Sequence, residues 1–272
     1  MSASDPTRSR HLGLWTYFVL YTFLLYIPLV ILGIFSLHTS ATLALPWQGF
    51  SLRWYREVAD SPELVNALKT SLVVAVVSAG ISTLVGAIAG IALGRFKFPG
   101  RGALAAVGLA PLAVPYLGLA VALLVTFLTL GIRPSVATVV IGHTVVAIPY
   151  VLLLVATRMA GLDDRTEDAA ADLGAPWWRI VYRIHLPLAR PALIVGFITA
   201  FQVSFDEFYL AYFLSGFRPT LPVYFFSSLR RGELVPPALA LSTVVTLLSI
   251  LLMAVTWAVS SRYLRTTPGA PE

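Results

Sequence analysis

Two adjacent carboxylates, Asp206 and Glu207, stand inside an otherwise apolar stretch of this sequence. Gln202 precedes Asp206 by one helical turn, and the rings of Phe205 and Tyr209 flank the pair. Ionisable residues in a membrane segment are costly and by default indicate a function. Carboxylates beside aromatic rings suit a cation, because a ring face attracts positive charge. The pair therefore predicts either a cation-attracting patch in a substrate pathway or a structural role. The structural role would be an ion pair at a gate or interface, with an arginine such as Arg218 or Arg230, or a pair that snorkels to the membrane surface.

The sequence gives little indication of cysteine, metal or nucleotide-binding sites. The chain has no cysteine, which excludes disulfides, thiolate metal sites and thiol nucleophiles. Its four histidines show no metal-ligand spacing, so no metal site is expected. His143, in an apolar stretch, is more typical of a hydrogen-bonded histidine between packed helices than of a ligand or proton site. The phosphate-binding pattern G-x-x-x-x-G-K-[ST] is absent, so ATP and magnesium are not expected to bind this chain.

The composition indicates the elements that must position these residues. Of 272 residues, 58% are hydrophobic and 12% are charged, and the mean hydropathy is +0.83. These values exclude a disordered chain and disfavour a soluble enzyme. The formal net charge of +6 is the kind of excess that membrane proteins place in their cytoplasmic loops, so we expect membrane lipids as partners and no nucleic acid.

Six apolar stretches are long enough to cross a bilayer as helices, which need about 20 residues each. They cover about residues 14–37, 67–93, 103–130, 136–157, 191–214 and 238–263. The first follows Arg8 and Arg10 as in a signal peptide, but it is longer than a signal sequence, so we interpret it as an uncleaved span. The sequence thus predicts an all-α fold, a polytopic membrane helix bundle with six transmembrane helices in a single domain over residues 1–272.

Small residues and prolines mark two of these spans. Gly86, Gly90 and Gly94 recur every four residues along one face of the second span. Such a face lets two membrane helices approach closely, either inside the bundle or, less commonly, between two copies of the chain. Pro111 and Pro115 are expected to kink the third span.

The orientation follows from the positive charges. With both termini in the cytoplasm, twelve of the 19 lysines and arginines fall on the cytoplasmic side. This bias favours that topology under the positive-inside rule. It places the segment between the fourth and fifth spans, residues 161–187, in the cytoplasm.

That segment has its own helix signals. Asp163 or Asp164 is a suitable N-cap, and acidic residues fill the first turn that follows. Gly174 is expected to end this helix at the position that favours a left-handed residue, and Pro176 blocks its continuation. A second short helix, 177–184, is expected to close at Leu186-Pro187. Two short helices with a glycine elbow predict either a docking element for a protein or an amphipathic hairpin on the lipid headgroups.

The spacing in this segment carries a family resemblance. Asp168-Ala169-Ala170 is followed by Gly174 after three residues and by Ile184-x-Leu186-Pro187 after nine more. This resembles the EAA motif of the membrane permeases of binding-protein-dependent ABC importers, with Asp168 where that family usually has Glu and with Glu167 beside it. The stretches 204–208, 213–216, 220–223 and 240–243 resemble most the spermidine/putrescine permease group of that family.

The resemblance implies a division of labour between several chains. The loop would dock as a coupling helix on a cytoplasmic ATPase dimer, which binds ATP and magnesium, while this chain needs no cofactor. A second homologous permease subunit and an extracytoplasmic substrate-binding protein would complete an importer in the bacterial inner membrane that works by alternating access. The docking residues would be Glu167, Asp168, Ala169, Ala170, Leu173, Gly174, Ile184, Leu186 and Pro187.

The substrate implied by the resemblance is a small cation such as a polyamine. Permeases of the same importer class carry ferric iron, phosphonates, opines or sulfate, and these stay as alternatives. A different class, an ion-coupled secondary carrier, predicts inverted repeats and charged residues near the membrane midplane. The sequence shows no internal repeat, and Asp206 lies roughly 22 Å beyond Pro191 along a helix, off the midplane.

Overall fold

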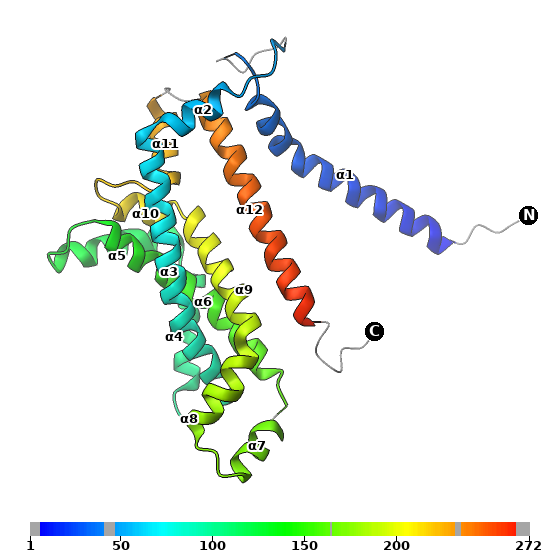
Figure 1. Ribbon diagram of the computed structural model, residues 1–272, viewed down its shortest axis with the longest axis vertical. Helices are drawn as coiled ribbons and strands as arrows, with labels where there is room; N and C mark the ends of the chain where they lie inside the picture. The colour runs from blue at the N-terminus through cyan, green and yellow to red at the C-terminus, as the bar shows by residue number, and fades with distance from the viewer. Residues whose placement is uncertain (1–5, 41–46, 164, 232–234, 265–272) are drawn as a thin grey trace, which may run out of the picture. The chain divides into compact units, whose positions relative to one another are not determined.

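The computed structural model describes residues 6–40, 47–163, 165–231 and 235–264. Most of these residues are helical, and the β structure described is an isolated antiparallel bridge between His38 and Phe50. The elements in Figure 1 are α1 Pro6–Phe35, α2 Arg53–Asp60, α3 Pro62–Arg95, α4 Arg101–Ala113, α5 Tyr116–Thr129, α6 Val136–Ala160, α7 Arg165–Asp172, α8 Trp177–Ile180, the π-helical η1 Val181–His185, α9 Leu186–Asp206, α10 Tyr209–Leu214, α11 Leu221–Arg231 and α12 Val235–Leu264.

The membrane architecture expected from the sequence is confirmed. Five helical stretches of the described residues are long and apolar enough to cross a bilayer, and the bent pair of α4 and α5 would make a sixth. The five stretches are Leu14–Phe35, Pro62–Arg95, Val136–Ala160, Trp177–Asp206 and Pro236–Ala258. The chain is therefore an all-α polytopic membrane protein.

The third expected span is two helices rather than one kinked helix. α4 ends at Ala113, α5 begins at Tyr116, and their axes are bent by 108°. Val114 between them is extended, with φ −93° and ψ 129°, because the ring of Pro115 disfavours helical geometry in the residue before it. Pro111 lies inside α4. Figure 1 shows α5 running across the direction of α4.

The fifth expected span differs at both of its ends. The prediction that a short helix closes at Leu186-Pro187 is wrong, because α8 continues through η1 directly into α9. A π-type turn changes the hydrogen-bond pairing immediately before Pro187, whose missing N–H would interrupt a regular α-helix. At the far end α9 stops at Asp206, so α10 is a separate short helix.

The described chain divides into two compact units, one with Met1–Pro62 and Ser228–Leu248, the other with Glu63–Ser227 and Ser249–Glu272. In the first unit, the indole Nε1 of Trp54 donates to the carbonyl of His38 at 2.7 Å. The hydroxyls of Ser36 and Tyr55 lie 2.7 Å apart. These contacts join α2 to the end of α1, whose large side chains from Leu14 to Ile34 are mostly exposed.

In the second unit, α3 packs closely on α6 along the glycine stripe. A Cβ on Gly86, Gly90 or Gly94 would lie 2.5 to 2.8 Å from the Cβ of the residue that it faces on α6. These facing residues are Val151, Val155 and Met159. Real Cβ atoms do not come that close, so the stripe is used for packing inside the bundle, the first of the two interpretations made from the sequence.

Two serines of α3 also bond to the backbone of α6. Ser78 Oγ donates to the carbonyl of Val140, and Ser82 Oγ donates to that of Thr144, both at 3.1 Å. α6 also packs against α9, where Val151, the residue that faces Gly86 of α3, approaches Gly196 as well. The three helices α3, α6 and α9 thus form the frame that holds the polar residues discussed next (Figure 1).

Candidate functional site

The predicted docking helix is present as α7, and its caps are local. The Asp163 carboxylate accepts the N–H of Arg165 at 3.0 Å, while Asp164 lies outside the described residues. At the other end Gly174 has φ +78°. Gly174 N–H donates to the carbonyl of Ala171 at 2.8 Å, and Ala175 N–H donates to that of Ala170 at 3.0 Å. This pair of bonds is a Schellman motif, which needs a left-handed residue at Gly174.

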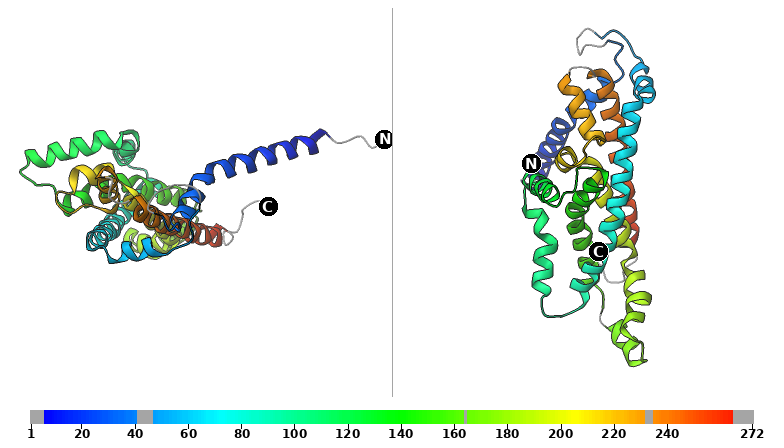
Figure 2. Two further views of the ribbon diagram at one scale, coloured as in Figure 1. Left: turned by 90° about the horizontal axis from the view of Figure 1, so that it is seen from above. Right: turned by 90° about the vertical axis from the view of Figure 1, so that its left-hand side faces the viewer.

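Much of the surface of α7 and the elbow is exposed. Asp168 and Ala169 are exposed, Ala170 is half-buried, and Leu173 is 89% exposed. Trp177, at the start of α8, is 72% exposed. Figure 1 and the right-hand view of Figure 2 both show α7 at one end of its unit. An exposed apolar side chain next to a carboxylate is the kind of surface that a partner protein covers.

Glu167, predicted as a docking residue, turns inward instead. Its carboxylate is ion-paired with the guanidinium of Arg95. Its Oε1 also lies 2.9 Å from Nε2 of His185, although the direction is not that of a hydrogen bond. Sequence reasoning missed Arg95 and His185, because they are 72 residues upstream and 18 residues downstream of Glu167 and only the fold brings them together. The only hint in the sequence was that each of the two residues lies next to the end of an apolar stretch.

The remaining predicted docking residues lie beyond the elbow. Ile184 belongs to η1, and Leu186 and Pro187 begin α9. All three are half-buried. The matching motif thus covers the exposed docking helix and the start of the long helix that enters the membrane.

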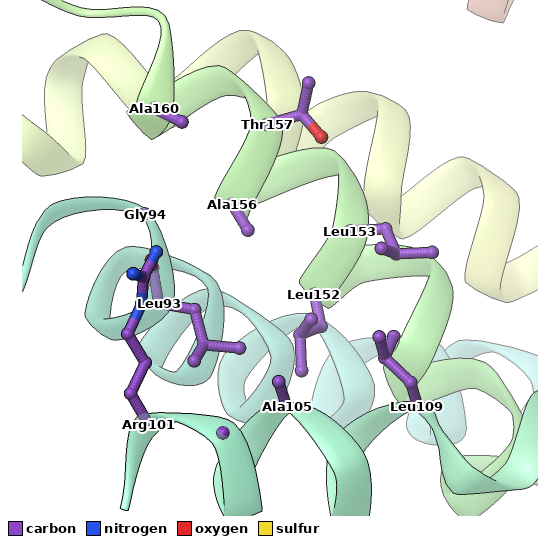
Figure 3. Close-up of a pocket in the computed structure, with 11 residues that line it drawn as sticks. Leu93, Gly94, Arg101, Ala105, Leu109, Leu152, Leu153, Ala156, Thr157 and Ala160 are labelled. Carbon is purple, nitrogen blue, oxygen red and sulfur yellow. The ribbon is translucent and has the colours of Figure 1, made fainter. Parts of the chain in front are cut away.

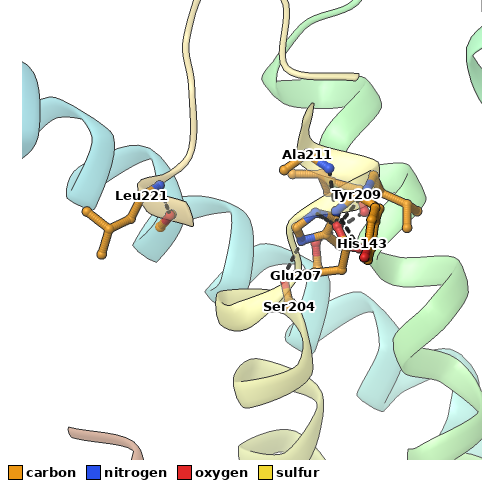
Figure 4. A network of polar contacts seen from close by, with 10 residues as sticks. His143, Ser204, Glu207, Tyr209, Ala211 and Leu221 are labelled. Atoms are coloured by element: carbon orange, nitrogen blue, oxygen red, sulfur yellow. Dashed lines mark hydrogen bonds and ion pairs between the residues drawn. The ribbon is translucent and has the colours of Figure 1, made fainter. Parts of the chain in front are cut away.

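Glu207, one of the two membrane carboxylates, caps a helix. Its Oε1 accepts the N–H of Tyr209 at 2.9 Å, and its Oε2 accepts those of Leu210 at 2.8 Å and Ala211 at 3.2 Å. The side chain is 2% exposed. The carboxylate thus satisfies the free N–H groups at the start of α10 where α9 breaks, as Figure 4 shows.

His143 completes this polar network. Its Nδ1 lies 2.8 Å from the hydroxyl of Ser204, and its Nε2 lies 3.4 Å from Oε2 of Glu207. The ring is fully buried on α6. This is the hydrogen-bonded histidine between packed helices that the sequence favoured. A structural ion pair with an arginine was the alternative for Glu207, but the side chain that lies beside its carboxylate is His143.

Asp206 is placed differently from its neighbour. It is the last residue of α9 and is exposed, and Tyr209 is 48% exposed. Gln202 is half-buried, whereas Phe205 is buried and stacks on Phe201 with ring centroids 5.7 Å apart. Of the five predicted pathway residues, Asp206 and Tyr209 are therefore accessible, and Phe205 and Glu207 are part of the bundle interior.

Aromatic rings gather just beyond Asp206. The ring of Phe208 lies 5.5 Å from that of Tyr209, 5.5 Å from that of Tyr212 and 5.0 Å from that of Phe226. Tyr212 and Phe226 are partly exposed. An exposed carboxylate followed by a group of aromatic rings can attract and hold an organic cation.

An open cleft of about 500 Å³ lies elsewhere in the same unit, between α3, α4 and α6. Figure 3 shows its mainly apolar lining, with Arg101 reaching back to Leu93, whose carbonyl accepts two hydrogen bonds from the guanidinium. The described lining holds no carboxylate, so the cleft does not suit a cation. In the part of the chain that the structure describes, no group of three metal-binding side chains occurs either.

The comparisons with known proteins agree with this architecture. Residues 82–265 match the family described as the binding-protein-dependent transport system inner membrane component. The chain is 34% identical to the spermidine/putrescine transport system permease protein PotC of Escherichia coli (strain K12), over 84% of this chain and 86% of that protein. It is also 34% identical to the putrescine transport system permease protein PotI of the same strain, over 78% of each chain.

The chain therefore belongs to the family of inner-membrane components of binding-protein-dependent transport systems. It is a permease subunit of an ABC importer and a transporter subunit rather than an enzyme. One chain in the crystal structure of a bacterial ABC transporter involved in the import of the acidic polysaccharide alginate has the same fold. That match has a TM-score of 0.70 and 15% identity, and it covers 97% of this chain and 99% of that one.

A second solved structure with this fold is an amino acid ABC transporter with histidines. The match has a TM-score of 0.60 and 14% identity, over 78% of this chain and 100% of that chain. At these identities the likeness concerns the fold and carries no information about the substrate.

Proposed function

We propose that this chain is the membrane-spanning half of an ATP-driven importer of polyamines such as spermidine or putrescine. The observation that carries the proposal is the 34% identity to PotC, which extends over 84% of this chain and 86% of PotC. Asp206 adds physical support, because its exposed carboxylate stands at a break in a membrane helix next to aromatic side chains. Discontinuous membrane helices are frequent at the substrate sites of transporters.

The other subunits follow from the same proposal. The whole chain acts as one permease domain, with both termini in the cytoplasm and α7 docked on a dimer of ATPase subunits that bind ATP and magnesium. A second, homologous permease subunit completes the pathway, and an extracytoplasmic binding protein delivers the substrate. The exposed apolar side chains along α1 provide a surface for lipid or for that second subunit.

Within the docking loop the residues divide by exposure. Asp168, Ala169 and Leu173 form the surface offered to the ATPase, and Gly174 sets the angle of the elbow. The partly buried Ala170, Ile184, Leu186 and Pro187 support that surface from behind.

Uptake by cells tests the substrate. A strain that lacks this chain would be supplied with the chain together with its ATPase, second permease and binding protein, and uptake of radiolabelled spermidine, putrescine and molybdate would be compared. Molybdate is the control, because a molybdate/tungstate permease of Thermococcus kodakarensis is 31% identical over 54% of this chain. We expect ATP-dependent uptake of a polyamine that returns only with the chain. Uptake of molybdate without either polyamine would refute the cation proposal and leave the importer class intact.

A further inference from the structure

Three residues from distant parts of the chain meet behind the docking helix. Glu167 on α7, Arg95 at the end of α3 and His185 at the end of η1 are joined through the Glu167 carboxylate. The side chains of Arg95 and His185 are 4% and 1% exposed, and that of Glu167 is 21% exposed. The ion pair between Glu167 and Arg95 is better shielded from water than a surface ion pair and is therefore the stronger interaction.

Arg95 also fastens the end of α6. Its Nη1 donates to the carbonyl of Met159 at 3.1 Å and to that of Leu162 at 3.0 Å. The preceding residue, Gly94, is in close contact with Met159. One guanidinium therefore holds the ends of α3 and α6 together and at the same time holds the carboxylate of α7.

His185 brings α9, the third long helix, into contact with the Glu167 carboxylate. It is the last residue of the π-helical segment that leads into α9, and its ring makes an edge contact with Phe96, with centroids 5.9 Å apart. The carboxylate of Glu167 thus touches the ends of two helices and, through Arg95, the carbonyl end of a third. A displacement of α7 reaches α3, α6 and α9 at this one place.

The next residue on α7 has the opposite environment. Consecutive residues of an α-helix are turned by about 100°, so Glu167 and Asp168 face different directions. Glu167 faces the bundle, and Asp168 is exposed with Ala169 and Leu173. The sequence alone does not indicate which of Glu167 and Asp168 faces a partner protein, but their surroundings in the structure differ.

We propose that Arg95, Glu167 and His185 form a coupling joint that passes the movement of the docked ATPase from α7 to the membrane helices. Glu167 acts as a positioning residue inside the joint, while Asp168 is the carboxylate that meets the ATPase. This inference rests on the proposed docking of α7. It assigns the role of the family's usual glutamate at the ATPase surface to Asp168.

The test uses the complete transporter, purified and reconstituted in liposomes with its binding protein. Glu167→Gln keeps the shape of the side chain and removes its charge, and Asp168→Asn is the matched control on the same helix. Three quantities are measured: the amount of ATPase subunit that co-purifies, the rate of ATP hydrolysis and the uptake of labelled polyamine. The ratio of hydrolysis to uptake reports coupling, which a loss of folded protein alone does not change.

We expect Glu167→Gln to retain the ATPase subunit and to lower uptake per ATP hydrolysed about tenfold, a usual size for coupling between sites. We expect Asp168→Asn to lower the amount of ATPase that co-purifies. The proposal is wrong if Glu167→Gln transports as much substrate per ATP hydrolysed as the wild type does. It is also wrong if both variants lose the same amount of co-purified ATPase. If the wild-type transporter retains no ATPase, the proposed function fails instead, so the two failures are distinguishable.

A cross-link gives a second, independent test. The chain has no cysteine, so Glu167→Cys with His185→Cys introduces a unique pair of thiols. The variant leaves Arg95 and its backbone acceptors at Met159 and Leu162 unchanged in sequence, so we expect these two hydrogen bonds to persist. We expect uncoupled ATP hydrolysis before cross-linking and recovery of uptake once a short bifunctional thiol reagent bridges the pair, with bridging verified by mass spectrometry. If uptake stays at the level of the unbridged variant after complete bridging, the contact between positions 167 and 185 is not what transmits the movement, and the proposal is contradicted.

Discussion

The Nδ1 atom of His143 lies 2.8 Å from the hydroxyl of Ser204, and this contact ties the buried face of α6 to the last turn of α9. The other nitrogen of the same ring faces Glu207, which caps α10. One histidine therefore lies against both sides of the place where the membrane helix breaks. Asp206, one residue before Glu207, is left exposed. The two adjacent carboxylates should respond differently to substitution.

Replacing Glu207 should affect stability first. Glu207→Ala removes the acceptor of three backbone N–H groups, two of them on the buried residues Leu210 and Ala211. We expect it to destabilise the folded chain by about 2–4 kcal/mol, the cost of buried donors left without partners. Thermal unfolding of the purified protein in detergent, followed by tryptophan fluorescence, measures this. An unchanged melting temperature would show that the cap is dispensable.

Replacing Asp206 should affect transport first. Asp206→Asn removes an exposed charge without removing a hydrogen bond that the structure describes, so the melting temperature should stay close to that of the wild type. Loss of about 1 kcal/mol of attraction for a cation would lower polyamine uptake about fivefold at limiting substrate. Asp206→Glu, which keeps the charge, should retain most of the uptake. If Asp206→Asn transports every cation tested as well as the wild type does, Asp206 has no role in the pathway.

The packing of α3 on α6 can be tested with two glycines of the same helix. Gly90→Ala would place a Cβ 2.8 Å from that of Val155 and 2.9 Å from the carbonyl of Leu152. We expect a loss of about 1–3 kcal/mol in stability from this overpacking. Gly80→Ala meets nothing within 4 Å and should be neutral or stabilising by about 0.5–1 kcal/mol. Equal melting temperatures for the two variants would contradict the close approach of the helices.

The elbow after α7 gives a prediction about backbone conformation. Gly174 has φ +78°, and nothing lies within 4 Å of the position of its Cβ, so strain rather than crowding limits substitution. A β-branched residue rarely adopts a positive φ, so Gly174→Val should distort the elbow and abolish coupling to the ATPase. The membrane spans should still insert. Gly174→Asn, which adopts it more readily, should keep part of the uptake. The measurement is uptake normalised to the amount of chain in the membrane fraction, and normal uptake by Gly174→Val would argue against the docking role.

The features that the sequence predicted well are set by neighbours along the chain. The end of α7 at Asp172 follows from Gly174 and Pro176, and the glycine stripe follows from a spacing of four residues. The apolar runs need no tertiary information to be recognised: five of the six correspond to single long helical stretches, and the third corresponds to the bent pair of α4 and α5. Such local signals are sufficient to identify the membrane bundle and the position of its docking loop.

The features that were missed depend on the fold. Pro187 was expected to end a helix, but the π-type turn at Val181–His185 lets the helix continue. Pro115 was expected to bend the third span and does so, but the proline alone does not predict a bend as large as 108°. Nothing in the adjacent pair Asp206 and Glu207 indicates which carboxylate is buried, because only the fold brings His143, more than 60 residues away, beside Glu207.

The serine bonds between α3 and α6 have a mechanical consequence. Because Ser78 and Ser82 bond to carbonyl groups of the backbone, the two helices resist sliding past each other whatever side chains α6 carries there. The 34 residues of α3 form a lever about 50 Å long. A tilt of about 5° at its Arg95 end would move its other end by about 4 Å, enough to open or close a passage for a narrow, flexible molecule. Small rotations at one membrane surface would thus be amplified at the other.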